Sequence, residues 1–403
     1  MTGNSGFISS RNSKFERNPK KTIFFVIFIS VSILDVVLTN IFLLYTSIIQ
    51  SEPNPTLGVK NEIYHHDFIK NGSVENEYPI LENRRIKLHT NSLGFKDKSS
   101  RRISLLPSKN FKKRIVFIGD SFTEGLMLEY KNTFVGIIDK ELNKQSIEVL
   151  NAGVSSYSPI IYWRKIKYLI EEVRLKFDEL SVFIDISDFC DEKYRYRLSK
   201  RGHVIDQTRY SIDAHWPSKT KSPIRLTDQI KKIVYSQTTL LYHATNAIYD
   251  LIKSDSANFS LYQQERIRNL SKLEHCNASW VFKKIDPDME YSIQKITKYM
   301  DKLLQLTRNN NIKLTIAVYP WPYQVLNEDL NSLHVKIWEE WCRKNNVYFI
   351  NYFPDFISKG LAHKEKIKIV KKYYIPSDVH FNKQGNKLLA KKFLKKYFLD
   401  KYS

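Results

Sequence analysis

Residues 115–118 have the sequence IVFI, and this run most constrains the fold. Four consecutive apolar residues, mostly β-branched, are typical of a strand covered on both faces, as in parallel sheets between helices. The run ends at Gly119, followed by Asp120 and Ser121. Open α/β sheets bind their ligands at the carboxyl ends of the strands. The sequence therefore predicts that Ser121 is presented at such an end.

Four further apolar runs predict strands, and helical patterns stand among them. The expected strands are residues 114–118, 147–150, 180–186, 313–319 and 347–350. The expected helices are residues 134–143, 160–172, 289–308, 331–344 and 383–398. This alternation predicts an α/β fold over residues 111–403, a three-layer α/β/α domain with a five-stranded parallel sheet of flavodoxin-like type.

Two segments do not follow this alternation. Residues 50–110 are polar and broken by proline and glycine, which predicts a linker and lead-in rather than an independent domain. Residues 195–285 are rich in charge and tyrosine, with amphipathic stretches at 227–235 and 239–252. We expect a helical insertion there, which either contacts substrate or serves as a spacer.

The N-terminal region predicts a membrane anchor over residues 22–49. Residues 23–45 are overwhelmingly apolar, and about 20 such residues cross a bilayer as a helix. The tail of residues 1–21 carries one glutamate, Glu16, against Arg11, Lys14, Arg17, Lys20 and Lys21. This bias predicts a cytoplasmic tail and an extracytoplasmic domain, periplasmic or at the cell surface. A cleaved signal peptide is the alternative, but no small-residue cleavage site follows the apolar stretch.

The net charge of +22 comes from lysines spread along the chain. No arginine-rich arm, zinc-finger spacing or RNA-binding aromatic motif accompanies them, so a nucleic-acid partner is not expected. Attraction to anionic glycans or lipid headgroups fits the charge, as does a general lysine bias. The three dispersed cysteines form no disulfide framework. Adjacent residues such as His65 and His66 do not converge on one ion without distant partners, so neither metal nor cofactor is expected.

A histidine near the C-terminus offers a base for Ser121. A serine hydroxyl is a poor nucleophile unless a base takes its proton. His380 can accept that proton through one ring nitrogen while the other donates to Asp378. Asn382 is expected to cap the helix that begins at residue 383. These residues predict a Ser-His-Asp triad, with a surface or capping histidine as the alternative.

Three segments, in this order, resemble the conserved blocks of the SGNH/GDSL hydrolases. Residues 119–123 (GDSFT) resemble the first block, residues 151–155 (NAGVS) the second, and residues 378–380 (DVH) the last. The resemblance implies an α/β/α hydrolase. It also implies that the backbone N–H groups of Ser121 and Gly153 stabilise the oxyanion. Alternatively, Gly153 only relieves a tight turn.

The third block departs from the family pattern, which reads Gly-x-Asn-Asp. Asp185 replaces the glycine and Ser187 the asparagine, whose side chain is an oxyanion donor in the family. The Ser187 hydroxyl can still donate, while the Asp185 carboxylate would repel an oxyanion if it pointed inward. Either the oxyanion hole is rebuilt around Ser187, or the domain binds its ligand without turnover.

An aromatic turn follows the fourth expected strand. Trp321 and Tyr323 could contact a sugar ring or could simply pack, and with Asp185 they are the predicted substrate contacts. The resulting hypothesis is a membrane-anchored esterase that acts on acyl groups, expected to be O-acetyl, of a cell-envelope polysaccharide. The alternatives are an O-acyltransferase on the same glycan and an inactive glycan-binding or assembly protein. The acylated glycan and membrane lipid are the expected partners.

Overall fold

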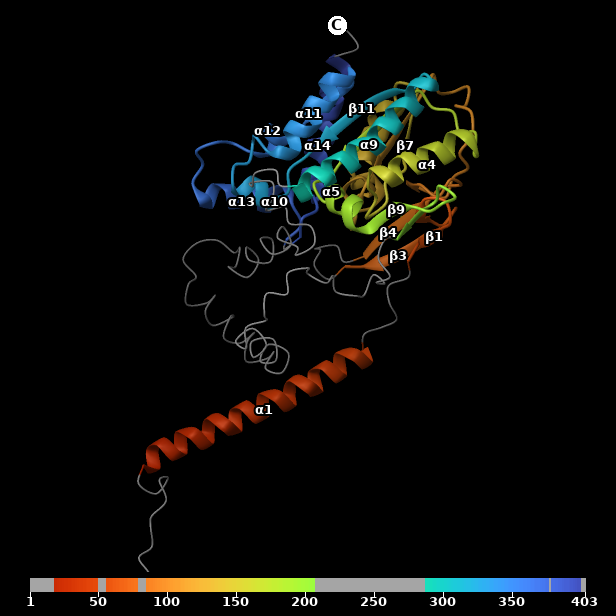
Figure 1. Cartoon of the computed structure of the whole chain (residues 1–403). Coiled ribbons are helices and arrows are strands. Elements are labelled where there is room, and N and C mark those ends of the chain that lie inside the picture. Colours follow the sequence, from red (N-terminus) through yellow and green to blue (C-terminus); the bar gives the residue numbers. More distant parts are fainter. Residues whose placement is uncertain (1–17, 50–55, 79–84, 207–286, 377, 400–403) are drawn as a thin grey trace, which may run out of the picture. The chain divides into compact units, whose positions relative to one another are not determined.

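The computed structural model describes residues 18–49, 56–78, 85–206, 287–376 and 378–399 (Figure 1). The chain divides into two compact units, Met1–Pro53 with Lys219–Asn258, and Asn54–Ser218 with Phe259–Ser403. Helix α1 (Pro19–Ile49) belongs to the first unit. The second unit contains the sheet and the candidate site.

Helix α1 has the length and composition of a membrane span. Its stretch Pro19–Ile41 has a mean hydropathy of 2.5, and 23 residues are enough to cross a bilayer. Apolar side chains along it, including Ile23, Phe24 and Phe28, are mostly exposed. A hydrocarbon environment would cover them. This helix matches the predicted anchor, while most of the basic tail lies outside the described residues.

The main sheet has eight strands in the order β12-β11-β8-β6-β7-β5-β4-β3. Its strands are β3 (Ser73–Glu77), β4 (Arg85–Thr90), β5 (Lys96–Asp97), β6 (Lys113–Gly119), β7 (Ile147–Asn151), β8 (Glu179–Ile184), β11 (Lys313–Val318) and β12 (Tyr348–Asn351). Strands β6, β7, β8, β11 and β12 pair in parallel. Their order is 2-1-3-4-5 by position in the chain, which is flavodoxin-like. The five predicted parallel strands are therefore confirmed.

The sheet is larger than predicted, because residues 50–110 are more than a linker and lead-in. Strands β3, β4 and β5 extend it beyond β7 with antiparallel pairing. Strands β1 (Gly58–Asn61) and β2 (His65–Phe68) form a separate antiparallel pair. Buried positions in this region include polar residues such as Asp67 and Asn76. The hydrophobic alternation that predicts a strand is consequently absent.

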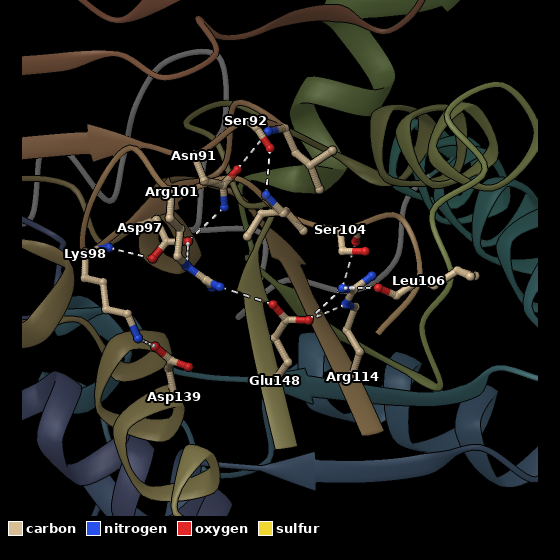
Figure 2. A network of polar contacts seen from close by, with 12 residues as sticks. Asn91, Ser92, Asp97, Lys98, Arg101, Ser104, Leu106, Arg114, Asp139 and Glu148 are labelled. Atoms are coloured by element: carbon tan, nitrogen blue, oxygen red, sulfur yellow. Dashed lines mark hydrogen bonds and ion pairs between the residues drawn. The ribbon is translucent and has the colours of Figure 1, made fainter. Parts of the chain in front are cut away.

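A buried network of charged groups ties the added strands to the parallel sheet (Figure 2). Asp97 Oδ2 accepts hydrogen bonds from Asn91 Nδ2 and Arg101 Nε, each at 2.9 Å. Arg101 Nη1 also donates to Glu148 Oε1 at 3.1 Å. Glu148 Oε2 in turn accepts from Arg114 Nε at 2.7 Å. The network therefore runs from β5 through β7 to the start of β6.

Two helical layers cover the sheet (Figure 1). The long helices are α3 (Phe134–Asn143), α4 (Pro159–Glu171), α9 (Pro287–Asn309), α11 (Leu333–Asn345) and α14 (Lys383–Leu399), close to the predicted bounds. Phe117 of β6 lies 6.1 Å from Phe134 of α3 and 5.2 Å from Phe393 of α14, ring centre to ring centre, so these helices share one face. Helices α4, α9 and α11 form the other layer.

Further helices and turns connect these layers. They are α2 (Ser121–Glu124), η1 (Tyr130–Asn132), α5 (Asp188–Cys190), the π-helical turn η2 (Asp191–Arg195), α10 (Pro322–Leu326), α12 (Phe353–Phe356) and α13 (His363–Tyr373). The predicted insertion begins with an antiparallel pair, β9 (Tyr196–Leu198) and β10 (Val204–Asp206), rather than a helix. The helical stretches predicted at residues 227–235 and 239–252 lie outside the described residues.

Candidate active site

The turn from β6 into α2 presents Ser121 at the carboxyl end of the strand. Asp120 caps the helix, because its Oδ1 accepts a hydrogen bond from Phe122 N at 3.0 Å. No larger residue fits at position 119 unless neighbouring atoms shift, since a Cβ there would lie 2.6 Å from the carbonyl oxygen of Phe183 and closer still to Thr123 Oγ1. The Gly-Asp-Ser order thus combines close packing, a helix cap and an available hydroxyl.

The structure brings Ser121, His380 and Asp378 together, although 259 positions separate the serine from the histidine. Ser121 Oγ lies 2.7 Å from His380 Nε2. His380 Nδ1 lies 2.5 Å from Asp378 Oδ1, which also accepts the His380 backbone N–H at 2.9 Å. When Nδ1 carries the hydrogen bonded to Asp378, the lone pair of Nε2 faces the serine hydroxyl.

The loop that carries Asp378 and His380 is held at both ends. Ile375 N donates to the His380 carbonyl at 2.9 Å, and Asp378 N donates to the Ile375 carbonyl at 3.1 Å. Asn382 caps α14 as predicted, with its Oδ1 accepting from Gln384 N at 2.8 Å and Gly385 N at 3.1 Å. The histidine is therefore fixed against a rigid helix.

The Asp378 carboxylate is stabilised in its charged form. Burial alone would raise its pKa, but the hydrogen bonds and charge of His380 outweigh burial, and the pKa lies below its usual value. The side chains of Asp378 and His380 are 21% and 14% exposed, so the pair is reachable from solvent. A charged Asp378 can stabilise the imidazolium that forms when His380 takes a proton.

The predicted oxyanion donors differ in availability. Gly153 N already donates to Asn151 Oδ1 at 3.1 Å, and Asn151 Nδ2 donates to the Thr123 carbonyl at 2.8 Å. A Cβ at Gly153 would lie 2.8 Å from Thr123 Cβ. Gly153 therefore packs where a side chain would meet Thr123, and its N–H reaches an oxyanion only by sharing its hydrogen with Asn151, so its oxyanion role stays a prediction.

Asp185 and Trp321, predicted as substrate contacts, are instead buried and bonded to each other. Trp321 Nε1 donates to Asp185 Oδ1 at 2.6 Å, and the two residues are 4% and 1% exposed. Ser187 Oγ donates to Asp185 Oδ2 at 2.7 Å, so its hydroxyl hydrogen is already used and does not serve as an oxyanion donor. The predicted substrate contacts of Asp185 and Trp321 and the predicted oxyanion role of Ser187 are therefore wrong for the observed arrangement. The Asp185 carboxylate accepts hydrogen bonds from both Trp321 and Ser187, so none of the three side chains is directed at a substrate.

The remaining predicted residues are placed as follows. Tyr323 lies in α10 and is partly exposed, so its contact with substrate stays a prediction. His66 Nε2 lies 2.8 Å from the Ser155 carbonyl, and Asp67 Oδ1 accepts from the buried Lys165 Nζ at 2.9 Å. Among the described residues, no group of three or more His, Cys, Asp or Glu side chains could hold a metal ion.

Sequence reasoning missed one contact that shapes the site. Glu124 of α2 is buried, and its Oε2 accepts from Ser155 N at 2.7 Å and Ser155 Oγ at 2.5 Å. This carboxylate ties the loop that contains Gly153 to the helix that carries Ser121. Its position three residues after the serine was the available signal, since that spacing places it on the same short helix.

No protein-family model and no curated protein sequence matches this chain. Among solved structures it is similar to an acetyl xylan esterase, with a TM-score of 0.37 and 11% identity over 70% of this chain and 98% of that chain. It is also similar to a G-D-S-L family protein from Desulfitobacterium hafniense DCB-2 (TM-score 0.35, 11% identity, 71% and 99% covered). A third is a psychrotrophic esterase from Pseudoalteromonas sp. (TM-score 0.33, 9% identity, 72% and 100% covered). The function proposed below depends instead on the contacts of Ser121, His380 and Asp378.

Proposed function

We propose that this protein is a serine esterase that acts on acyl groups of a cell-envelope polysaccharide, with O-acetyl groups as the expected ester. The continuous hydrogen bonding from Asp378 through His380 to Ser121 carries the proposal. Its two distances, 2.5 and 2.7 Å, are within reach of proton transfer.

The reaction follows from the positions of these atoms. Ser121 Oγ attacks the ester carbonyl carbon while its proton passes to His380 Nε2, and the carbonyl oxygen becomes an oxyanion. The C–O bond to the sugar then breaks, and the imidazolium gives its proton to the leaving hydroxyl. Water next attacks the acyl-serine with His380 as base, which releases the carboxylic acid and restores the serine.

The oxyanion is stabilised in this proposal by the backbone N–H of Ser121, at the start of α2. Oxyanion donors are effective because they are fixed before charge develops. The N–H of Gly153 contributes by dividing its hydrogen between Asn151 and the oxyanion. A single full donor and one shared donor predict slower turnover than in an enzyme with an asparagine at position 187.

The proposed location and substrate rest on the N-terminal region. The basic residues of the N-terminal tail favour a cytoplasmic N-terminus, and we therefore expect the proposed active site outside the cytoplasm. Glycan esters of the envelope are accessible there. The tested substrate should therefore be an O-acetylated oligosaccharide rather than a soluble cytoplasmic ester.

A fluorophosphonate probe and an aryl acetate test the proposal with the full chain in detergent. We expect covalent labelling and acetate release in the wild type, both lost in Ser121→Ala and His380→Ala. Ser108→Ala is the matched control, because Ser108 is an exposed serine before β6, at the other end of that strand. An unlabelled wild type without acetate release would contradict the proposal and favour an inactive binding protein. Acetyl transfer to an added oligosaccharide in preference to water would identify an acyltransferase.

A further inference from the structure

Two helices frame the loop that carries Asp378 and His380. Helix α13 ends before this loop, and α14 begins after it. Asn382 joins the two helices, because its Nδ2 donates to the carbonyls of Lys372 and Tyr374, each at 3.0 Å. The end of α13 and the start of α14 therefore meet two residues after the proposed catalytic histidine.

Each of these helices carries a stripe of exposed lysines. Residues four apart lie on the same face of a helix, about 6 Å apart along its axis. The exposed lysines follow this spacing on both helices, and we call them the lysine stripes. They are Lys364, Lys368 and Lys372 on α13, and Lys383, Lys387, Lys391 and Lys395 on α14.

Nearby carboxylates leave the positive charge of the stripes uncompensated. Helix α14 contains no Asp or Glu, and Glu365 of α13 is turned toward the start of its own helix, where it accepts from Ala362 N at 3.0 Å. Among the described residues, no carboxylate forms an ion pair with a stripe lysine. The neighbouring acids pair with other lysines: Glu328 with Lys366, Asp355 with Lys392 and Glu129 with Lys131.

A general lysine bias does not account for this distribution. Other long helices place acids among their basic residues, as α9 does with Asp288, Glu290 and Asp301, and α11 with Glu339 and Glu340. A bias that acted evenly along the chain would give α13 and α14 the same mixture. The uncompensated charge instead coincides with the two helices that frame the candidate active site.

We propose that the lysine stripes bind an anionic polysaccharide, with carboxylate or phosphate groups along its chain, and lead its ester groups to Ser121. The inference rests on the proposed esterase function and names the class of its glycan. A single exposed charge contact contributes little, so useful binding requires a partner that contacts several lysines at once. A charged polymer does so, and a small ester does not.

The position of the stripes favours a glycan over a membrane surface. Anionic headgroups also attract clustered lysines. Both stripes converge at Asn382, however, so a polymer bound along either one passes the catalytic loop. Helix α13 also packs against α10, whose partly exposed Tyr323 is the remaining predicted substrate contact. A headgroup layer held by both stripes would stand between this site and its substrate.

Binding to the Ser121→Ala full chain, held in phosphatidylcholine nanodiscs, tests the stripes without turnover. The probe is an O-acetylated oligogalacturonate, compared with its carboxamide derivative, which has the same sugars and no charge. We expect the acidic form to bind at least about tenfold more tightly, and Lys383→Gln/Lys387→Gln/Lys391→Gln to abolish most of that preference. The affinity should also fall less steeply with salt in this triple variant, because fewer counterions are released.

A second triple variant controls for net charge. Lys109, Lys112 and Lys176 are exposed and precede β6 and β8, at the ends of these strands opposite Ser121. Lys109→Gln/Lys112→Gln/Lys176→Gln removes the same charge and should keep the preference for the acidic probe. Equal losses in the two triple variants would overturn the inference. Stripe-dependent capture of the nanodiscs by phosphatidylglycerol vesicles, without a preference for the acidic glycan, would overturn it as well.

Turnover separates this inference from the proposed function. In the chain that retains Ser121, the ratio of kcat/KM for acetate release from the acidic probe to that from the carboxamide should fall at least about fivefold in the stripe variant, through KM rather than kcat. An unchanged ratio would overturn the inference while the esterase function stands. A wild type that binds the acidic probe and releases no acetate from either form would refute the esterase function, and the binding would still support the stripes as a polyanion site.

Discussion

Replacing Arg114 by methionine should strongly destabilise the domain, because it removes the buried arginine at one end of the network in Figure 2. The Arg114 side chain is fully buried, and its Nε donates to Glu148 Oε2 at 2.7 Å. Its remaining N–H groups donate to the carbonyls of Ser104, Leu105, Leu106 and Lys176 at 2.9–3.3 Å. Methionine matches much of the volume but supplies none of these donors.

The size of the expected change in the free energy of unfolding depends on which ion-pair partners Glu148 loses and which it keeps. Removing one partner of a buried ion pair costs about 3–5 kcal/mol, because the other charge stays buried. Glu148 retains Arg101 Nη1 at 3.1 Å, and Arg101 is only 25% exposed, which favours the lower end of that range. We therefore expect Arg114→Met to reduce the free energy of unfolding by about 3 kcal/mol. Adding Glu148→Gln removes the stranded charge and should restore about 1 kcal/mol or more.

Denaturant titration of the full chain in detergent, followed by tryptophan fluorescence, measures these changes. Lys144→Met is the control, because its ion pair with Glu141 is exposed to solvent and its loss should leave the midpoint of unfolding close to that of the wild type. Fluorophosphonate labelling per folded molecule should be unchanged, since Arg114 and Ser121 lie at opposite ends of β6. A loss below about 1 kcal/mol in Arg114→Met, or no recovery in the double variant, would refute the reasoning.

Three further outcomes are expected. Asp378→Asn should lower kcat/KM at least about 100-fold in acetate-release assays, because an amide facing Nδ1 favours the tautomer whose Nε2 cannot accept the serine proton. Gly153→Ala should lower the free energy of unfolding by about 1–3 kcal/mol in denaturant titrations, since its Cβ would meet Thr123. Burial raises the pKa of Glu192 to about 8, so the folded state holds a proton that the unfolded state releases. Stability should therefore fall from about pH 4.5, the ordinary glutamate pKa, to about pH 8, by at most about 1.4 kcal/mol per pH unit, and Glu192→Gln should flatten that slope.

The parallel sheet could be predicted because its strands are buried on both faces. Residues 115–118 show this most clearly, since all four are fully buried in β6. The long helices were equally predictable from their apolar spacing, and α3 matches its expected bounds, residues 134–143. These elements carry their structural signal in consecutive or periodic apolar residues, which one sequence displays directly.

The antiparallel extension could not be predicted in the same way, because polar contacts between distant residues stabilise it. Lys96 of β5 is buried, and its Nζ donates to the carbonyls of Gly125 at 2.8 Å and Leu128 at 2.6 Å. A lysine in a polar segment predicts an exposed side chain. Its burial depends on carbonyl groups that only the fold brings near, so the sequence around residue 96 indicates a linker.

The candidate site shows the same division between local signal and distant contact. Asn382 was recognisable as a helix cap, because capping depends on residues two and three positions away. The pairing of Asp185 with Trp321 was not, since 136 positions separate them. Pattern comparison with the family therefore found the departures at residues 185 and 187 but could not say where those side chains point.

Asp185 and Ser187, which depart from the pattern of the third block, form one hydrogen-bonded group with Trp321 of the aromatic turn. An aspartate at position 185 requires buried donors, and the Trp321 indole and the Ser187 hydroxyl provide them. Trp321 is also only 4% exposed, so its ring does not present a free face to a sugar. Asp185 and Ser187 are thus hydrogen-bonded to each other, and position 187 has no asparagine side chain that could donate to an oxyanion. It follows that Ser187→Asn alone should not restore a family-like oxyanion hole, because the asparagine would still face Asp185.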